Sequence, residues 1–173
     1  RTGKRVQGIV LNGWSDALAY ACKSFPALRT LHLNAEDEHH MEELDGRTGA
    51  CNPFGSIARH CTALTSITLA GPGSFGVEPG QCALLLHECQ HLEELVCLGL
   101  LQRFYPPVPA VVRPALRELT VGGMQLTEDD LTRIATSFPN LTSLRLEQLM
   151  PGSIESIEPG MLLAAQNLHT LEL

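Results

Sequence analysis

The sequence predicts an α/β solenoid, in which stacked helix–strand units share one parallel sheet on the concave side and carry helices outside. Two observations lead to this prediction. An apolar frame recurs along the chain at intervals of about 22 to 36 residues, which is the signature of a repeat architecture. Within each unit, the apolar spacing also changes from that of a helix to that of a strand. We expect about seven units in a single domain that spans residues 1–173.

The second half of each frame predicts a short strand. Each frame has an anchor leucine, and the six anchors are Leu28, Leu64, Leu92, Leu116, Leu141 and Leu168. Apolar residues follow three and five positions later, as Leu31 and Leu33 follow Leu28. Side chains two residues apart lie on the same face of a strand, so this pair predicts a half-buried strand in each unit. Val6, followed by Ile9 and Leu11, is the earliest unit.

The residues before an anchor predict an amphipathic helix. Apolar residues recur there at intervals of three and four, which places them on one helix face. They are Leu18, Ala21, Phe25 and Leu28 in one unit, and Leu131, Ile134, Phe138 and Leu141 in another. Thr127 followed by Asp130 is a capping-box pattern, and Asn52 before Pro53 is a polar cap before a first-turn proline. The order within each unit is therefore helix, then strand.

The unit before Leu116 is predicted to be poor in helix. Prolines interrupt the segment from Gln102 to Pro114, and proline removes a backbone donor and fixes φ, so we expect an extended or polyproline-like chain. The aromatic and apolar residues of this segment, from Phe104 to Val112, have two possible roles. They either form an exposed interface patch or cover the outer side of their unit, and we favour the covering role.

Charge and hydropathy exclude two classes of partner. The net charge is −7, whereas nucleic-acid binding depends on clustered lysine and arginine. No apolar run approaches the roughly 18 residues of a membrane span, and no N-terminal signal pattern is present. We expect a protein partner, and neither nucleic acid nor a membrane.

The six cysteines have two possible states. An even number suggests disulfides in a small secreted domain. Four of them, Cys61, Cys82, Cys89 and Cys97, occupy apolar positions of the repeat, where a reduced cysteine acts as a small buried hydrophobe. We therefore expect reduced core thiols and an intracellular protein, cytoplasmic or nuclear, because those compartments keep thiols reduced.

Two histidine-containing segments and one glycine-rich segment are the candidates for a chemical site. The acidic segment 36–43 contains adjacent histidines that cannot easily converge on one ion, and segment 87–91 lacks a second ligand pair. The glycine-rich segment 71–76 lacks the Lys-Ser/Thr of a phosphate loop, and no Gly-x-Ser-x-Gly turn is present. We expect no catalytic residues, no metal, no cofactor and no enzymatic activity.

The frame from Phe138 to Leu146 and its copies resemble leucine-rich repeats. The preceding segment, Leu126 to Ile134, resembles the helix of the ribonuclease-inhibitor-like and F-box-associated repeat subclass. Two departures are the helix-poor unit and the absence of asparagine or cysteine eight residues past the anchor. Those positions hold Trp14, Glu36, Pro72, Leu100, Met124 and Leu149. Because the chain begins at Arg1 and ends at Leu173, on a core position, we expect a fragment of a longer array.

The resemblance implies a horseshoe-shaped, non-catalytic protein-interaction module, specifically the substrate-recognition arm of an F-box-type ubiquitin-ligase adaptor. Two alternatives stay open. One is the ligand-sensing repeat domain of an innate immune receptor. The other is a GTPase-activating protein of ribonuclease-inhibitor-like fold, in which Arg145 or Arg103 would assist hydrolysis.

The candidate binding residues lie two, four and six positions past the anchors, where strand side chains alternate with the buried leucines. They are His32, Thr68, Glu94, Val96, Glu118, Thr120, Arg145, Glu147 and Glu172. Glutamates outnumber the single arginine in this set, so we expect a basic partner. The sequence leaves the oligomeric state open.

Overall fold

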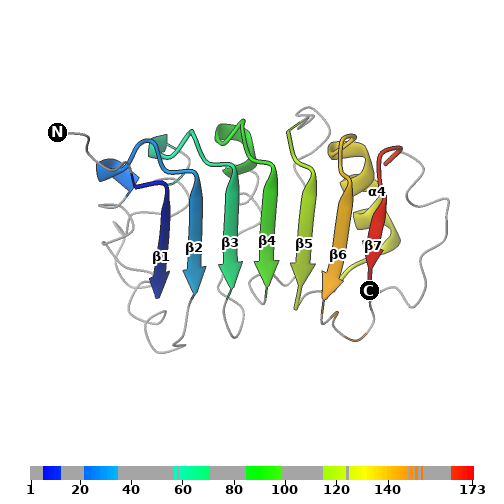
Figure 1. Cartoon of the computed structure of the whole chain (residues 1–173). Coiled ribbons are helices and arrows are strands. Elements are labelled where there is room, and N and C mark those ends of the chain that lie inside the picture. The colour runs from blue at the N-terminus through cyan, green and yellow to red at the C-terminus, as the bar shows by residue number, and fades with distance from the viewer. Residues whose placement is uncertain are drawn as a thin grey trace, which may run out of the picture.

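The computed structural model of the chain is mixed α/β with one open, all-parallel sheet of seven strands (Figure 1). The structure describes residues 6–12, 22–34, 57, 59–70, 85–98, 115–123, 125–147, 149, 151, 153 and 165–173. The strands are β1 Gly8–Asn12, β2 Thr30–Asn34, β3 Ser66–Ala70, β4 Glu94–Leu98, β5 Glu118–Gly122, β6 Ser143–Glu147 and β7 Thr170–Glu172. They lie in chain order, so the predicted parallel sheet is confirmed and the architecture is compatible with a repeat solenoid.

Every strand pairs with the next in the same register. Residues at the same position of the frame lie opposite one another, as Leu31 lies opposite Ile67 and Leu119 opposite Leu144. The backbone hydrogen bonds recur in the same way. Arg29 N and Thr30 N both donate to the Gln7 carbonyl, at 2.8 and 2.9 Å. At every later pair of strands, two consecutive backbone N–H groups again donate to one carbonyl of the preceding unit. The accepting carbonyls are those of Arg29, Thr65, Glu93, Arg117 and Thr142.

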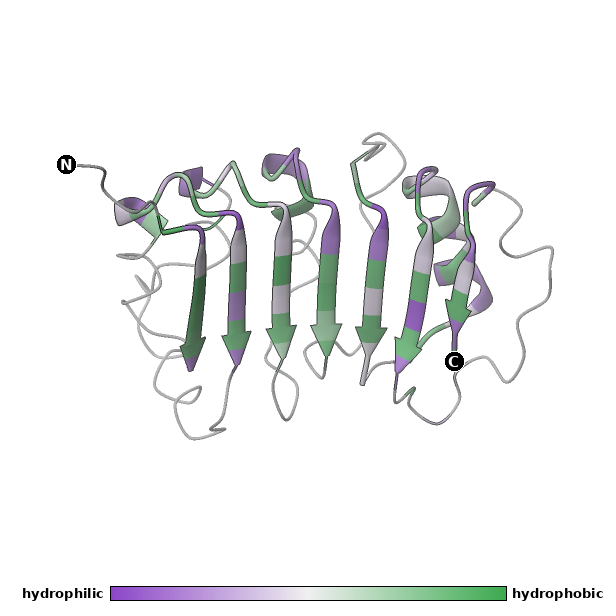
Figure 2. Cartoon of the chain, viewed as in Figure 1, coloured by the Kyte–Doolittle hydropathy of each residue, from purple (hydrophilic) through white to green (hydrophobic). Residues whose placement is uncertain are grey.

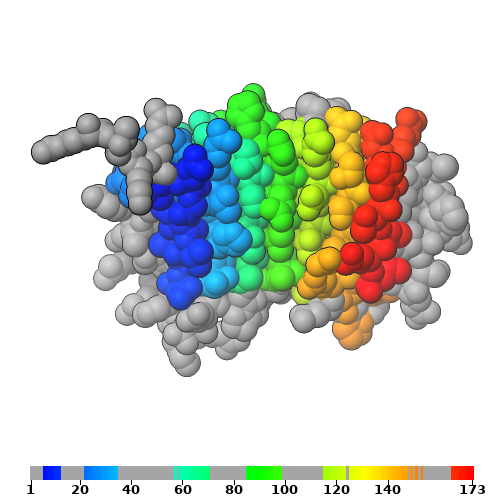
Figure 3. Space-filling view, in the orientation of Figure 1, coloured from blue at the N-terminus to red at the C-terminus, as the bar shows by residue number. Residues whose placement is uncertain are grey.

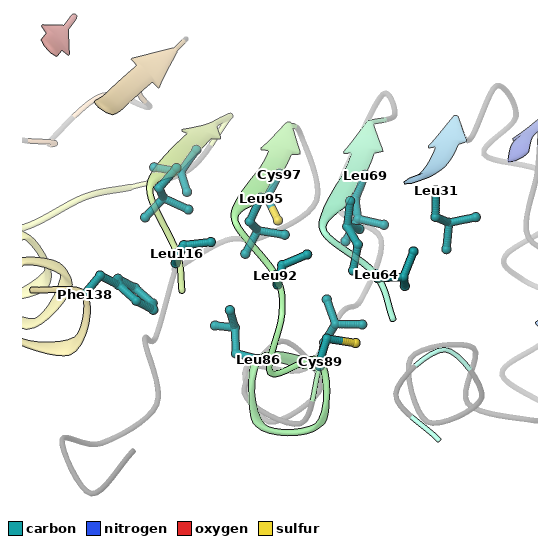
Figure 4. Packing of buried hydrophobic residues seen from close by; sticks show 14 of the residues in the cluster. Leu31, Leu64, Leu69, Leu86, Cys89, Leu92, Leu95, Cys97, Leu116 and Phe138 are labelled. Carbon is teal, nitrogen blue, oxygen red and sulfur yellow. The ribbon is translucent and has the colours of Figure 1, made fainter. Parts of the chain in front are cut away.

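The core lies between the sheet and the side of the molecule that carries the helices. In strands β2, β3 and β4, buried residues alternate with half-buried ones, and Figure 2 shows apolar and polar bands alternating along the strands. In Figure 4, Leu95 of β4 points toward Leu86, in the helical stretch 85–88, and Cys89, in the turn that follows it. The anchors Leu28, Leu64, Leu92, Leu116 and Leu141 are all buried, as predicted.

Helix α4, Glu128–Ser137, confirms the helix predicted before Leu141. Its capping box is complete, because Asp130 N donates to Thr127 Oγ1 at 3.3 Å and Thr127 N donates to Asp130 Oδ2 at 3.0 Å. These bonds satisfy backbone donors that a helix N-terminus otherwise leaves unpaired. Leu131 and Ile134 face the core. Shorter helical stretches are described at 22–24 and 85–88.

A tight turn precedes strands β2, β3, β4, β6 and β7. In this turn the anchor N–H donates to the carbonyl three residues earlier. The pairs are Leu28 to Phe25, Leu64 to Cys61, Leu92 to Cys89, Leu141 to Phe138 and Leu168 to Ala165, at 3.0 to 3.2 Å. Pro26 and Pro139 occupy the second position of their turns, where proline is favoured. Each of these five strands begins two residues after the anchor that closes the turn.

Two glycines shape the end of β5. Gly123 has a φ of 70°, a conformation that L side chains rarely adopt. At Gly122, an added Cβ would lie 2.6 Å from the Glu147 carbonyl oxygen. The missing side chain at this position lets β5 and β6 approach closely.

Three residues differ from the sequence prediction. Cys22 is fully buried, although the helical spacing did not include it in the core face. Phe25 is partly buried and packs against the core, as that spacing predicts, and Ala21 lies outside the described residues. Leu171 and Leu173 are exposed although the frame predicts core positions. Among the described strands β7 is the last of the sheet, so only β6 packs beside it.

Several predicted features lie outside the described residues. They are the cap at Asn52, the helix-poor segment Gln102 to Pro114, the acidic segment 36–43 and the glycine-rich segment 71–76. In the part of the chain that the structure describes, no helix has the length and apolar character needed to cross a membrane.

Candidate functional site: the exposed face of the sheet

The sheet exposes one face, which we call the sheet face. It consists of the side chains that alternate with the buried strand residues, and the strands lie side by side across the front of the molecule in Figure 3. The middle row contains one residue from each strand: Val10, His32, Thr68, Val96, Thr120, Arg145 and Glu172. The sheet face is therefore a continuous strip across all seven strands.

The nine residues predicted from the sequence all lie on the sheet face. His32, Thr68, Val96, Thr120, Arg145 and Glu172 are in the middle row. Glu94 and Glu118 lie opposite each other one row nearer the strand starts. Glu147 lies at the end of β6, opposite Gly122. The shared register, which follows from the recurring frame, brings these residues together.

Arg145 changes the expected charge of the sheet face. Its Nε lies 2.5 Å from Glu172 Oε2, and a second guanidinium nitrogen lies 3.8 Å from Glu147 Oε1. The hydrogen bond and charge of Glu172, and to a smaller extent Glu147, raise the pKa of Arg145. These side chains are well exposed, so solvent screening keeps each contact weak. The arginine still neutralises part of the acidic excess that the sequence predicts for β6 and β7.

Glu94 and Glu118 form the more acidic part of the sheet face. They are direct neighbours on β4 and β5. Like charges in this position repel each other. Ser66 Oγ donates to Glu94 Oε2 at 2.6 Å, and among the described ion pairs none involves either glutamate. This pair therefore offers more uncompensated negative charge than Glu147 and Glu172 do.

Apolar side chains lie beside this acidic pair. Val96, in the middle row, comes two residues after Glu94 on β4, and Leu98 is the last residue of that strand. The Leu98 side chain leans over Gly122, because its Cδ2 lies 3.0 Å from the position that a Cβ on Gly122 would take. Acidic and apolar groups thus occur together on neighbouring strands.

Sequence reasoning missed Val10, which extends the middle row to β1 and is well exposed. A signal for it was present, since Val10 is four positions past Val6, as the other middle-row residues are four past their anchors. It also missed the contacts of Arg145. The contacts of Arg145 depend on side-chain conformations, which the spacing of residue types does not indicate.

The described residues outside the sheet face offer little chemistry. Nowhere among them do three or more metal-ligating side chains gather. His87 Nδ1 contacts Glu88 Oε1 at 2.9 Å in an exposed pair, and a shallow hollow between two turns is lined by Thr62, Ala63, Glu88, Gln90 and His91. Neither feature brings a nucleophile next to a base.

The described cysteines are core residues. Cys22, Cys61, Cys89 and Cys97 are buried and form no disulfide, as predicted for the apolar positions of the frame. A hydrogen bond with Cys22, together with burial, raises the pKa of Cys61, while the same bond lowers the pKa of Cys22. The Cys61 thiol is therefore uncharged at neutral pH, which suits a packing role.

No protein-family model matches this chain, and no curated protein matches it. What the structure itself shows is the open parallel sheet, whose outward side chains form the sheet face.

Proposed function

We propose that this chain is a non-catalytic protein-interaction module of the leucine-rich repeat kind, which binds a protein partner on the sheet face. The observation that carries the proposal is the unbroken middle row, which presents one outward side chain from each of seven parallel strands. Solenoids bind partners on extended surfaces of this kind. The fully apolar inner side of the sheet is occupied by the core and leaves the sheet face free for contact.

The partner is expected to carry basic side chains. Glu94 and Glu118 supply adjacent negative charge, and the whole chain has a net charge of −7. Opposite charge on a partner steers the encounter and sets the register of binding. Val96 and Leu98 add apolar area beside the charge, so the best partner combines a basic group with an apolar one.

At a finer level, the proposed role is the substrate-recognition arm of an F-box-type ubiquitin-ligase adaptor. Two observations support the repeat subclass that implies this role: the recurring frame and the capped helix α4 before Leu141. The buried reduced thiols are compatible with the cytoplasm or nucleus, where such adaptors would act.

The alternative of a GTPase-activating protein gains no support from the sheet face. A catalytic arginine must reach the nucleotide, whereas Arg145 contacts Glu172 and Glu147. Arg103, the other candidate, lies outside the described residues.

The test is a selection of binders from a displayed random peptide library against the chain, followed by affinity measurement on two matched variants. Thr120→Arg places a bulky cation in the middle of the sheet face, and Thr132→Arg makes the same change on the exposed side of α4. We expect Thr120→Arg to weaken most selected binders by about tenfold or more and Thr132→Arg to leave them unchanged. Binders that ignore Thr120→Arg would contradict the proposal.

A further inference from the structure

The sheet face holds one arginine of the chain itself between two carboxylates. Arg145 Nε lies 2.5 Å from Glu172 Oε2, and Arg145 Nη1 lies 3.8 Å from Glu147 Oε1. Glu172 is the register partner of Arg145 on the neighbouring strand, whereas Glu147 lies two residues further along β6. The sheet face therefore presents carboxylates at a spacing that one guanidinium can span.

Glu94 and Glu118 are a second pair of carboxylates on adjacent strands. They lie directly opposite each other on β4 and β5, and neighbouring strands are about 4.8 Å apart. Their neighbours in the same row are Ser66 on β3 and Ser143 on β6. None of the ion pairs among the described residues includes either glutamate. Arg145 therefore leaves this pair uncompensated.

A hydroxyl group orients one of the two carboxylates. Ser66 Oγ donates to Glu94 Oε2 at 2.6 Å. An ionised carboxylate has about four acceptor sites, so Glu94 can still accept hydrogen bonds from a partner. Like charges on directly opposite residues repel, so a cation that contacts both glutamates also relieves this repulsion. The pair is thus arranged to receive positive charge.

The spacing of the two carboxylates favours a guanidinium over other cations. A guanidinium is planar and carries five N–H donors in a fixed fork, so it can contact two carboxylates at once, as Arg145 does. An ammonium group is a compact point charge. A metal ion would need further ligands, and among the described residues no three metal-ligating side chains come together. Arginine is therefore the cation that fits this pair best.

Methyl groups lie one row further along the same strands. Thr68, Val96 and Thr120 are neighbours in the middle row, and all three are half-buried. Two residues along a strand span about 6.6 Å, and an extended peptide has the same spacing between side chains on one face. An apolar side chain two residues from the bound arginine would therefore lie on Val96.

We propose that Glu94 and Glu118 together bind one arginine of the protein partner, in an extended Arg-x-apolar segment whose apolar side chain packs on Val96. The inference rests on the proposed function, because it assigns a residue chemistry to the partner of the sheet face. A partner seated there excludes water from the glutamates, so its charge-assisted hydrogen bonds are stronger than those of the exposed Arg145.

The first test removes the charge of the pair. It uses sheet-face binders, defined as the selected peptides that Thr120→Arg weakens and Thr132→Arg does not. The double variant Glu94→Gln with Glu118→Gln should weaken these binders by about tenfold or more, because charge-assisted hydrogen bonds are lost. Circular dichroism checks the fold. Glu118→Gln alone, at the more exposed glutamate, replaces the double variant if that variant does not fold.

The matched control is Glu88→Gln with Glu128→Gln, at two exposed positions away from the sheet face. It changes the net charge by the same amount and should alter affinity by less than about threefold. Equal effects of the two double variants would overturn this inference but not the proposed function, because the binders would still depend on Thr120. If no selected binder depends on Thr120, both fail.

The second test identifies the cation. Each arginine of a sheet-face binder is replaced in turn by lysine, and affinity is measured for the unaltered chain and for Glu94→Gln with Glu118→Gln. We expect one arginine whose replacement weakens binding by about tenfold to the unaltered chain and much less to the double variant, because groups in contact are not additive. Sheet-face binders that contain no arginine, or that accept lysine without loss, would overturn the proposal.

The third test concerns the apolar side chain of the segment. Val96→Thr keeps the shape of the side chain and replaces a methyl group by a hydroxyl. It should weaken a binder with an apolar residue two positions from the arginine by about threefold or more, and should have less effect once that residue is alanine. An equal effect on both peptides would contradict the extended Arg-x-apolar segment.

Discussion

Leucines at the same position of the frame are buried in some strands and exposed to solvent in others. Leu144 on β6 is fully buried, whereas Leu171, its register partner on β7, is partly exposed. Full burial of a leucine side chain stabilises by about 1.5 to 3 kcal/mol relative to exposure. The contribution of the frame to stability therefore depends on the neighbouring strand as well as on the residue.

The first prediction compares alanine at these two positions. Leu144→Ala should lower the free energy of unfolding by about 2 to 5 kcal/mol, because it removes buried methyl groups and leaves a cavity. Leu171→Ala should cost only about 1 kcal/mol or less, since part of its side chain already contacts water. Urea denaturation with an unchanged m-value measures both. Similar losses at the two positions would contradict the assigned ends of the sheet.

The second prediction concerns the buried thiol of Cys61. Its pKa is raised, so the folded state holds the neutral thiol and that preference stabilises the fold below the ordinary thiol pKa of 9.0. As pH rises above about 9, the unfolded chain loses a proton that the folded chain keeps, and stability should fall. Brief alkylation at pH 8 followed by mass spectrometry should find Cys61 unmodified in the native protein and modified in urea. Rapid native labelling would contradict the core assignment.

At the scale of one element, helix α4 depends on its N-terminal cap. Thr127 and Asp130 satisfy each other's backbone amides, and Glu128 and Asp129 add negative charge near the positive end of the helix dipole. Both features were predictable from sequence because they involve residues at most three positions apart.

The third prediction removes this cap. Thr127→Ala should lower the free energy of unfolding by about 1 kcal/mol, because it leaves the Asp130 amide without its side-chain acceptor. Arg133→Ala, on the exposed side of the same helix, is the matched control and should change stability by less than about 0.5 kcal/mol. Thermal unfolding followed by circular dichroism measures the difference. A cap variant as stable as the control would show that tertiary packing alone holds α4.

The strands were predictable and the contacts across the sheet face only partly so. The apolar pair after each anchor identifies the strand, and the equal spacing of that pair predicts the register in which Leu119 meets Leu144. The pairing of Arg145 with Glu172 depends on rotamers on two strands that lie far apart in sequence. The exposure of Leu173 depends on its place beside the last described strand of the sheet, which a local pattern does not indicate.

At the scale of the whole molecule, stability is built from contacts between neighbouring strands. The strand order follows the chain, and the main contacts between described strands join each strand to the next. In such an architecture the interior strands have two covering neighbours and the end strands have one. Local opening should therefore be easiest at the ends.

The last prediction follows from this gradient. In dilute solution, hydrogen exchange should be slowest for the amides of β3, β4 and β5 and fastest for those of β7, where every described strand residue is exposed. Mass spectrometry of peptic fragments measures this pattern. Protection of β7 equal to that of β4 would contradict the gradient.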